Sequence, residues 1–324
     1  MAKTRAYGSD VQCLAAFEAT YGTAPNGGGG GVYTKVSFSS ADIGAEKPLG
    51  YSPLLGQGRD AQDPFYDATN VEGSIKVPLE LRAIGFWLKG VLGAPATVDN
   101  TGGKYTHTFK SGGDLLSLAL EFGHTKLATQ KHFLNTGAKL DTLSFPMQRT
   151  GAAEADLGVI AQGETSGPTA QDASPLSYAL KRFNNGKGSI KVAGGQLANV
   201  TAGQFSFSNN MEKVETIRDD GLIDGADETE ATATGTIDVR FSTDTTLADA
   251  IDAETPVALE YGFTIPGGAG HALTFKLPRV FLPRKKLPIS GPGGISVTYD
   301  WQAAFDSVEG HMLEVILVND VASY

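Results

Sequence analysis

Apolar and polar residues alternate over two matching stretches of the chain, 75–79 and 237–241. Alternation with a period of two residues predicts a strand with one buried face and one face in water. Further apolar runs typical of strands follow in both halves, over 116–122, 140–145, 157–160, 257–263, 295–301 and 313–317. The pattern therefore predicts a mainly β protein.

One segment of each half has helical spacing instead. The apolar residues of the first such segment are Leu81, Ile84, Leu88, Val91 and Leu92. Their recurrence every three or four residues predicts a helix over 81–92 that ends at Gly93 in a left-handed conformation. Packing of Trp87 in the core is favoured over a role as an anchor between subunits. In the second half, Thr245 is expected to cap a shorter helix.

Two low-complexity stretches divide the chain. The glycine run at 27–31 follows a short N-terminal segment that is predicted to be a brief helix or a loop. Residues 163–175 combine small polar residues with two prolines and no aromatic residue, a composition typical of linkers. We therefore expect four parts, namely an N-terminal arm, a first β domain, a linker and a second β domain, over 1–31, 32–165, 166–187 and 188–324.

The two halves also share an order of elements. Each contains a Ser-Phe-Ser sequence, at 37–39 and 206–208, and then an acidic, turn-rich loop, at 56–72 and 216–231. The alternating strand, the helix and the remaining strands follow in both. Such a shared order predicts an internal duplication, with two tandem β-sandwich or barrel units that each carry one flanking α-helix.

The balance of charge bears on possible partners. The chain has 26 basic and 36 acidic residues, a formal net charge of −10. Tight binding of a nucleic acid requires a cationic surface, so a nucleic-acid-binding protein is disfavoured. A negatively charged surface repels DNA and lets it pass without binding. No stretch approaches the roughly 20 apolar residues that cross a bilayer, and the N-terminus lacks the apolar core of a signal peptide. A cytosolic product is the simplest expectation.

Residue types that carry chemistry do not form a recognisable set. The single cysteine, Cys13, excludes an intramolecular disulfide and a cysteine-based zinc site, and its apolar neighbours favour a buried small residue. The histidines show no metal-binding spacing, and His107 is expected to pack on a strand. Neither a phosphate-binding loop nor a Gly-x-Ser-x-Gly motif is present. The sequence predicts no enzyme, no metal and no cofactor.

Clusters of acidic residues allow more than one interpretation. Asp219, Asp220, Asp224 and Asp227 fall within one loop and could be a hydrolytic carboxylate pair or an oxygen-rich calcium site. The spacing lacks the regular ligand order of a calcium loop. A solvated or partner-facing loop is therefore favoured over both alternatives.

The densest basic patch consists of Arg279, Arg284, Lys285 and Lys286. Its cations alternate with aromatic and apolar residues and could touch DNA. Because the whole chain is acidic, a salt bridge with an acidic loop of a neighbouring subunit is favoured over DNA binding.

Several short motifs carry a resemblance. They are Phe-Glu-Ala-Thr-Tyr-Gly-Thr-Ala-Pro at 17–25, Leu-Leu-Gly-Gln-Gly-Arg-Asp at 54–60, Gly-Ser-Ile-Lys-Val-Pro-Leu at 73–79 and Gly-Phe-Trp-Leu-Lys at 85–89. With Glu-Phe-Gly-His at 121–124 and the segment 158–164, they resemble the tail tube (major tail) proteins of siphophages. The first half matches densely and the second half only in pattern.

The resemblance implies an assembly protein of the virion tail, made in the cytoplasm of the host bacterium. Tail tube subunits join their sheets into rings, and the rings stack into a hollow tube through which DNA passes as transient cargo. The implied partners are further copies of the chain and the tape measure, terminator and distal tail proteins, with no membrane and no cofactor. An ordinary subunit has one fold and forms hexamers, so a duplicated chain implies trimeric rings with pseudo-sixfold symmetry, and the hexamer holds if the duplication is absent.

Long polar loops that become ordered on binding are the expected contacts between rings and subunits. The candidate residues are Gln57, Arg59, Asp60, Asp63, Phe65, Tyr66, Arg218, Asp219, Asp220, Asp224 and Asp227.

Two other functions remain open at this point. A carbohydrate- or surface-binding decoration module would be a monomer with exposed aromatic residues on its loops, whereas Trp87 and Trp301 lie in periodic elements. A hydrolase would lose turnover on replacement of Asp219 or Asp224.

Overall fold

The computed structural model describes residues 4–28, 30–267, 270–287, 289 and 291–324. Their strands, β1 to β24, far outnumber the two α-helices, so the mainly β class is confirmed. Nearly all strands belong to one open, mixed sheet, in which the pairing of β14 with β2 is parallel. Short 3-10 turns, Gly8–Asp10 and Asn185–Lys187, precede β1 and β15.

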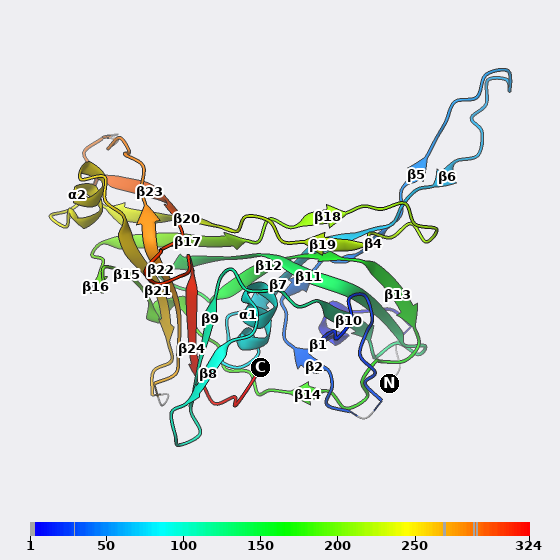
Figure 1. The fold of residues 1–324 in the computed structure, drawn as a ribbon, viewed down its shortest axis with the longest axis horizontal. Coiled ribbons are helices and arrows are strands. Elements are labelled where there is room, and N and C mark those ends of the chain that lie inside the picture. The colour runs from blue at the N-terminus through cyan, green and yellow to red at the C-terminus, as the bar shows by residue number, and fades with distance from the viewer. Residues whose placement is uncertain (1–3, 29, 268–269, 288, 290) are drawn as a thin grey trace.

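A central run of antiparallel strands crosses the whole molecule (Figure 1). Its order is β4–β7–β12–β11–β17–β20–β23–β22, with β3 beside β4 on the edge of β7. The bounds of these strands are Ser40–Ala41 (β3), Gly44–Glu46 (β4), Asn70–Pro78 (β7), Glu154–Ala161 (β12), Lys131–Gln148 (β11), Val200–Ser208 (β17), Thr232–Arg240 (β20), Ser296–Ala303 (β23) and Ala272–Phe281 (β22).

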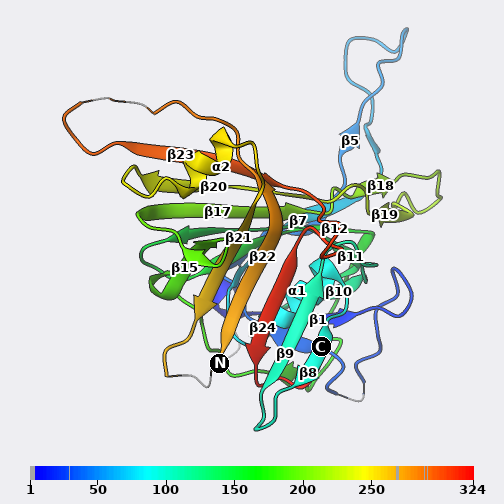
Figure 2. The same ribbon diagram turned by 60° about the vertical axis from the view of Figure 1, so that its left-hand side comes forward.

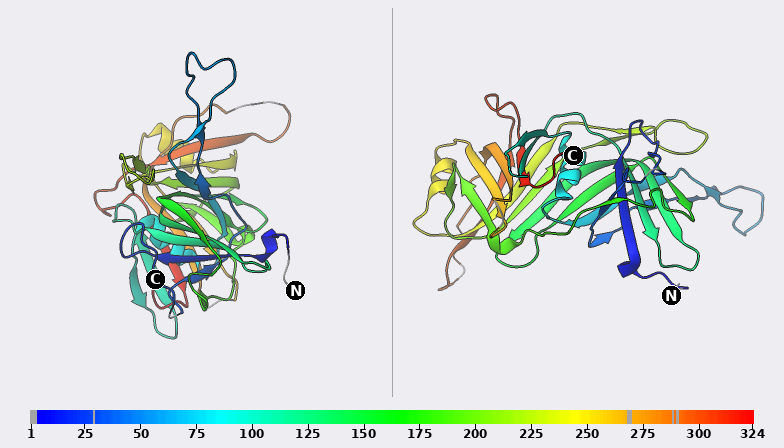
Figure 3. Two further views of the ribbon diagram at one scale, coloured as in Figure 1. Left: turned by 90° about the vertical axis from the view of Figure 1, so that its right-hand side faces the viewer. Right: turned by 90° about the horizontal axis from the view of Figure 1, so that it is seen from below.

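Two lateral groups of strands continue from β11 and β22, whose first residues leave the central run (Figures 2 and 3). Beside β11 lie Leu176–Ser177 (β14), Thr34–Val36 (β2), Val11–Phe17 (β1), Leu118–His124 (β10) and Gly163–Gly167 (β13). Beside β22 lie Ala96–Asp99 (β8), Tyr105–Lys110 (β9), Glu314–Asn319 (β24), Val257–Thr264 (β21), Gly188–Val192 (β15) and Gly195–Gln196 (β16).

The N-terminal segment is a strand, so the expected brief helix or loop is wrong. In β1, Cys13, Leu14, Ala15 and Ala16 are all buried because both faces of the strand are covered. Cys13 and Ala15 face the main core, and Leu14 and Ala16 face a second small cluster around Tyr33. A strand covered on both faces has no alternation for the sequence to display.

The first helix, α1 (Ile84–Leu92), packs against β9 and β11 and is buried along almost its whole length. Trp87 is 2% exposed, so its predicted place in the core is confirmed. Gly93 follows the helix with a φ of 88° and donates its N–H to the Lys89 carbonyl, as expected for a glycine end. Upstream, the buried Glu80 carboxylate accepts the N–H of Ile84 at 3.1 Å.

The second helix, α2 (Thr246–Asp252), is more exposed and buries only Leu247. The Thr245 hydroxyl makes no capping bond and donates to Asp249 at 2.8 Å, so that predicted cap is wrong. Asp244 takes this role, because its carboxylate accepts the N–H of Thr246 at 3.2 Å.

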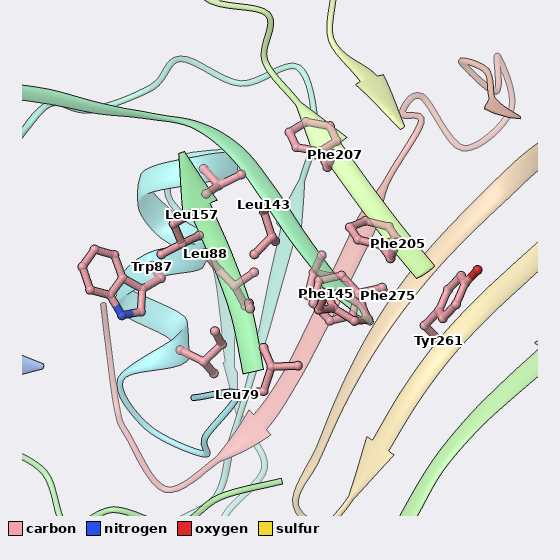
Figure 4. Close-up of a cluster of buried hydrophobic side chains, with 14 of the residues drawn as sticks. Leu79, Trp87, Leu88, Leu143, Phe145, Leu157, Phe205, Phe207, Tyr261 and Phe275 are labelled. Carbon is pink, nitrogen blue, oxygen red and sulfur yellow. The ribbon is translucent and has the colours of Figure 1, made fainter. Parts of the chain in front are cut away.

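Aromatic side chains from both halves of the chain meet in one core (Figure 4). Phe145 and Phe205 stack at 4.9 Å, and Phe275 lies 4.8 Å from Phe145 and 5.1 Å from Phe205. The Trp301 indole N–H donates to the Tyr261 hydroxyl at 2.8 Å. The buried indole N–H of Trp301 therefore has a partner, and the aromatic core joins the two halves.

Candidate assembly surfaces

The first arm, residues 47–69, extends away from the body of the molecule (Figures 1 and 2). Its base is the pair of short strands Leu49–Gly50 (β5) and Phe65–Tyr66 (β6). All residues of 51–68 are exposed, among them the predicted contact residues Gln57, Arg59, Asp60, Asp63, Phe65 and Tyr66. Large apolar side chains are exposed as well, including Leu55 at 97% and Tyr66 at 73%. A projecting arm with an apolar surface is typical of an interaction element.

The second arm, residues 209–231, contains the strands Glu212–Val214 (β18) and Gly225–Asp227 (β19). It lies against the base of the first arm. The Lys213 ammonium donates to Asn70 at 2.6 Å and to Glu72 at 2.7 Å, and the Thr69 N–H donates to the Gly221 carbonyl at 3.0 Å. The two arms therefore leave the body side by side.

Arg218 holds two of the acidic residues of the second arm. Its guanidinium donates to Asp220 at 2.7 and 3.0 Å and to Asp224 at 2.8 Å. These bonds lower the pKa of Asp220 from 3.8 to about 2. The predicted acidic loop is thus partly neutralised within its own chain, while the side chains of Asp219 and Asp227 are exposed.

Asp220 is expected to remain ionised down to a pH of about 2. Because its pKa is lower in the folded arm, the ion pair contributes fully above the ordinary pKa and is lost as the pH falls through about 2. Carboxyl carbon shifts followed by NMR measure this titration. In Arg218→Gln the pKa should rise towards 3.8, and an unchanged value would contradict the assignment of its cause.

A polar face covers one side of the central run. It consists of alternate residues, exposed or half-buried, including Ser74, Lys76, Thr142, Ser144, Asp156, Gln204, Ser206, Thr234, Thr236, Asp238, Thr298, Asp300 and Gln302. The opposite side carries the buried partners, such as Ile75, Leu157, Phe205 and Ile237. The strand alternation predicted from the sequence therefore produces one broad, hydrophilic wall.

Most charges on the polar face have a partner. Lys76 pairs with Asp156 at 3.3 Å, and Asp238 accepts a bond from the Thr298 hydroxyl. Asp300 pairs with Lys285. The remaining surface is largely of Ser, Thr and Gln, which offers few cations to hold a phosphate backbone.

The predicted basic patch is only partly brought together. Arg279 stacks over the Phe281 ring, with 5.2 Å between the guanidinium carbon and the ring centroid. Arg284 lies 3.5 Å from Asp252, Lys285 contacts Asp300, and Lys286 is exposed. Two of the four cations thus have acidic partners in their own chain.

Buried polar groups form a feature that the sequence did not indicate. Glu121 and His132 pair at 2.9 Å with both side chains buried. Glu18 accepts the N–H groups of Gly22 and Gly137 at 2.9 Å. Because Glu18 and Gly137 are far apart in the chain, no local sequence pattern indicates their contact.

Cys13 and His107, which could in principle carry chemistry, are both buried in the fold. Cys13 is fully buried, which confirms the prediction of a buried small residue, and burial raises its pKa. His107 is buried on β9 and bonds to Asn319 and to the Val321 carbonyl, as expected for a packed histidine. Within the described part of the chain, no group of three or more His, Cys, Asp or Glu side chains could hold a metal ion. No helix among these residues is both long and apolar enough to span a bilayer.

A family model described as phage tail tube protein matches residues 8–303. The chain belongs to this family. Tail tube proteins are structural components of the virion tail and are not a family of enzymes. A comparison with curated proteins returned no match. The match extends well beyond the first half, in which the sequence motifs are densest.

Proposed function

We propose that the chain polymerises into trimeric rings with pseudo-sixfold symmetry, which stack into the hollow tail tube and conduct DNA. Two tandem units within each chain would supply six equivalent sheets to one ring. The polar face is the wall of the channel in this proposal. The observation that carries it is the repeated strand pairing of the two halves.

Two hairpins in the two halves have the same register. Ala41 pairs with Ile75, and Gly203 pairs with Ile237, each 162 positions later. The relation persists at the other end of the hairpin, where Ala45–Val71 corresponds to Phe207–Ala233. The helices that follow, α1 and α2, also begin 162 positions apart. The equivalent strands are thus β3–β4 with β17 and β7 with β20, so the two Ser-Phe-Ser sequences are not counterparts.

The other strands repeat the same neighbours. β12 lies between β7 and β11, and β23 lies between β20 and β22. β10 and β21 pair with β11 and β22, and the register of both pairs shifts at one place, between Leu118 and Leu120 and between Val257 and Leu259. A shared bulge at an equivalent place supports two copies of one unit.

The polar face suits the passage of DNA. Its uncharged hydroxyl and amide groups are easily hydrated, and its ion pairs are closed within the chain. An anionic polymer therefore finds no cationic stripe on which to bind. DNA is accordingly proposed as transient cargo and not as a ligand.

The arms supply the contacts along the tube in this proposal. The first arm carries apolar side chains that a single copy leaves in water, such as Leu55 and Tyr66. Head-to-tail contact of this kind between unlike surfaces produces an open-ended stack. Assembly in the host cytoplasm, with tape measure, terminator and distal tail proteins at the ends, completes the proposal.

Purified protein concentrated in solution is expected to form hollow tubes in negative-stain electron microscopy. The tubes should show transverse striations about 4 nm apart, the height expected of tilted strands in a barrel wall. End-on views should have sixfold features, while mass measurement of single rings gives three chains. Discrete monomers at high concentration would contradict the function, and six chains in a ring would contradict the trimer.

A further inference from the structure

We infer that a ring closes by pairing residues 284–287 and Ile289 of one copy with the β3–β4 edge, residues 40–46, of the next copy. The occupant of each surface is a second copy of this chain. The inference rests on the proposed ring and assigns the strands and the register by which neighbouring copies join.

The junction between the two halves within one chain provides the template. The last residues of β11 pair antiparallel with β17, with Leu143 opposite Phe207 and Phe145 opposite Phe205. All four of these side chains are buried, at 1% exposure or less. One half therefore joins the other through a fully packed strand pair.

The counterpart of this part of β11 lies after β22. Next to the shared bulge, Ala138 of β11 pairs with Leu118, and Val280 of β22 pairs with Val257. Ala138 and Val280 are therefore equivalent, and they are 142 positions apart. Residues 142–145 of β11 therefore correspond to 284–287. These residues are exposed and belong to no strand, although their counterparts 142–144 are paired with both β12 and β17, and Phe145 is paired with β17. Leu287 is 42% exposed where Phe145 is 1% exposed, and Ile289 is 77% exposed where Met147 is 5% exposed.

The counterpart of β17 is the β3–β4 edge. Both short strands pair with β7 on one side, and among the described strands none pairs with their other side. Ala41, Asp42, Ala45 and Glu46 are exposed, while Ile43 packs against the core. Glu164 covers part of this edge, since its carboxylate accepts the N–H of Ala45. An edge protected by a carboxylate is kept from indiscriminate pairing.

Transferring the register of the internal junction pairs the two edges residue by residue. Leu287 then faces Ile43, and Ile289 faces Ala41, on the side of the sheet that carries the core. On the polar face, Arg284 lies opposite Glu46. Leu287 and Ile289 thus meet apolar residues and Arg284 meets an anion, which is the complementarity that a strand pair requires. Lys285 takes the place of the buried Leu143 and lies opposite Ala45.

Lys286 adds to this complementarity. In the transferred register it lies opposite Gly44, on the polar face, with Glu46 and Asp42 at the two diagonal positions. Diagonal neighbours on one face are within reach of a long side chain. Arg284 and Lys286 of the basic patch therefore match Asp42 and Glu46 of the edge. The pair of Arg284 with Asp252 within one copy leaves Arg284 82% exposed, so exchanging it for an ion pair across the junction costs little.

Cysteine cross-linking tests the register. Ala45→Cys and Lys285→Cys, made in separate chains and mixed before assembly, are expected to give a disulfide-linked dimer on oxidation of the tubes, with at least tenfold more product than either variant alone. A chain that carries both substitutions should give linked species up to the full ring. The native Cys13 is buried and does not compete. Ala45→Cys mixed with Phe281→Cys, four residues out of register, is the matched control.

Tubes that form normally but yield no more 45–285 product than the control would overturn this inference and leave the proposed function intact. Absence of tubes from the unmodified protein would overturn both. If the cysteine variants fail to assemble, exchanging the charges of Arg284 and Glu46 tests the pairing instead. Arg284→Glu should reduce tube formation at least tenfold, and the combination with Glu46→Arg should restore it. A failure of the combined variant to recover would contradict the pairing.

Discussion

Replacing residues 51–64 by a two-residue Asn-Gly turn is expected to abolish tubes and leave single rings. The turn would close the β5–β6 hairpin directly after its Gly50–Phe65 pair, so that the base of the arm is kept. The deletion removes Tyr51, Leu54 and Leu55, which are exposed in one copy. Burial of such a side chain in a contact contributes about 1.5–3 kcal/mol. Loss of three of them should raise the concentration needed for stacking by more than about a hundredfold.

The measurement combines electron microscopy with sedimentation of rings and tubes at the same protein concentration. Val308→Ser is the matched control, because Val308 is an apolar residue at 90% exposure that lies outside both arms. It should form tubes as the unmodified protein does. Normal tubes from the shortened arm would show that stacking uses another surface. Loss of rings together with tubes would indicate a role of the first arm within the ring.

The alternation of apolar residues predicted much of this fold correctly. Positions such as Ile75 and Ile237 are buried, and their polar neighbours face water. A strand with one face in water has apolar and polar residues in alternation, so the sequence shows which side chains face the core. The helix over 81–92 was also visible, since its apolar residues recur at helical spacing. The structure has it from Ile84 to Leu92.

Features that depend on distant partners were not visible. β1 was not visible because both of its faces are covered. In β22, by contrast, the buried residues Leu273, Phe275 and Leu277 alternate with less buried ones, so this strand has a local signal in the sequence. The length of β11 follows from its change of partners, from β10 and β13 to β12 and β17. A change of partners leaves no mark on periodicity.

Some features of the candidate surfaces also follow from local sequence, and others depend on distant partners. The exposed position of Gln57 or Tyr66 follows from local turn residues, and the sequence places both correctly in a projecting loop. The ion pair of Arg218 with Asp220, two residues away, is a local contact between opposite charges that the sequence can indicate. The polar side of each strand follows from the alternation, as at Ser74 and Thr236, but no motif marks the polar face as a whole. Its breadth exists only once the strands of both halves lie side by side.

The two halves share one core and several strand pairs. β9 of the first half pairs with β24 of the second, in addition to the junction of β11 with β17. Phe145 of the first half contacts Phe205, Tyr261, Phe263 and Phe275 of the second. Separate unfolding of one half would expose these rings in the other. We therefore expect a single unfolding transition for the monomeric chain.

Phe205→Ala is accordingly expected to lower the free energy of unfolding of the whole chain by about 3–5 kcal/mol, the usual cost of a large cavity in a core. Phe205 is fully buried and touches aromatic residues of both halves, including Trp301 at 6.1 Å. Urea titration of the monomer, read by tryptophan fluorescence, measures the change. In a Trp87→Phe background the fluorescence comes from Trp301 and reports the second half. In a Trp301→Phe background it comes from Trp87 and reports the first half.

Both signals should shift together in Phe205→Ala, because the cavity lies in a core that the halves share. Phe305→Ala is the matched control, since Phe305 is 64% exposed and its loss should change the free energy of unfolding by no more than about 0.5 kcal/mol. A shift of the Trp301 signal alone would mean that the halves unfold separately. In that case the β11–β17 junction would be a weak contact, and a ring junction built on the same register would be weak as well.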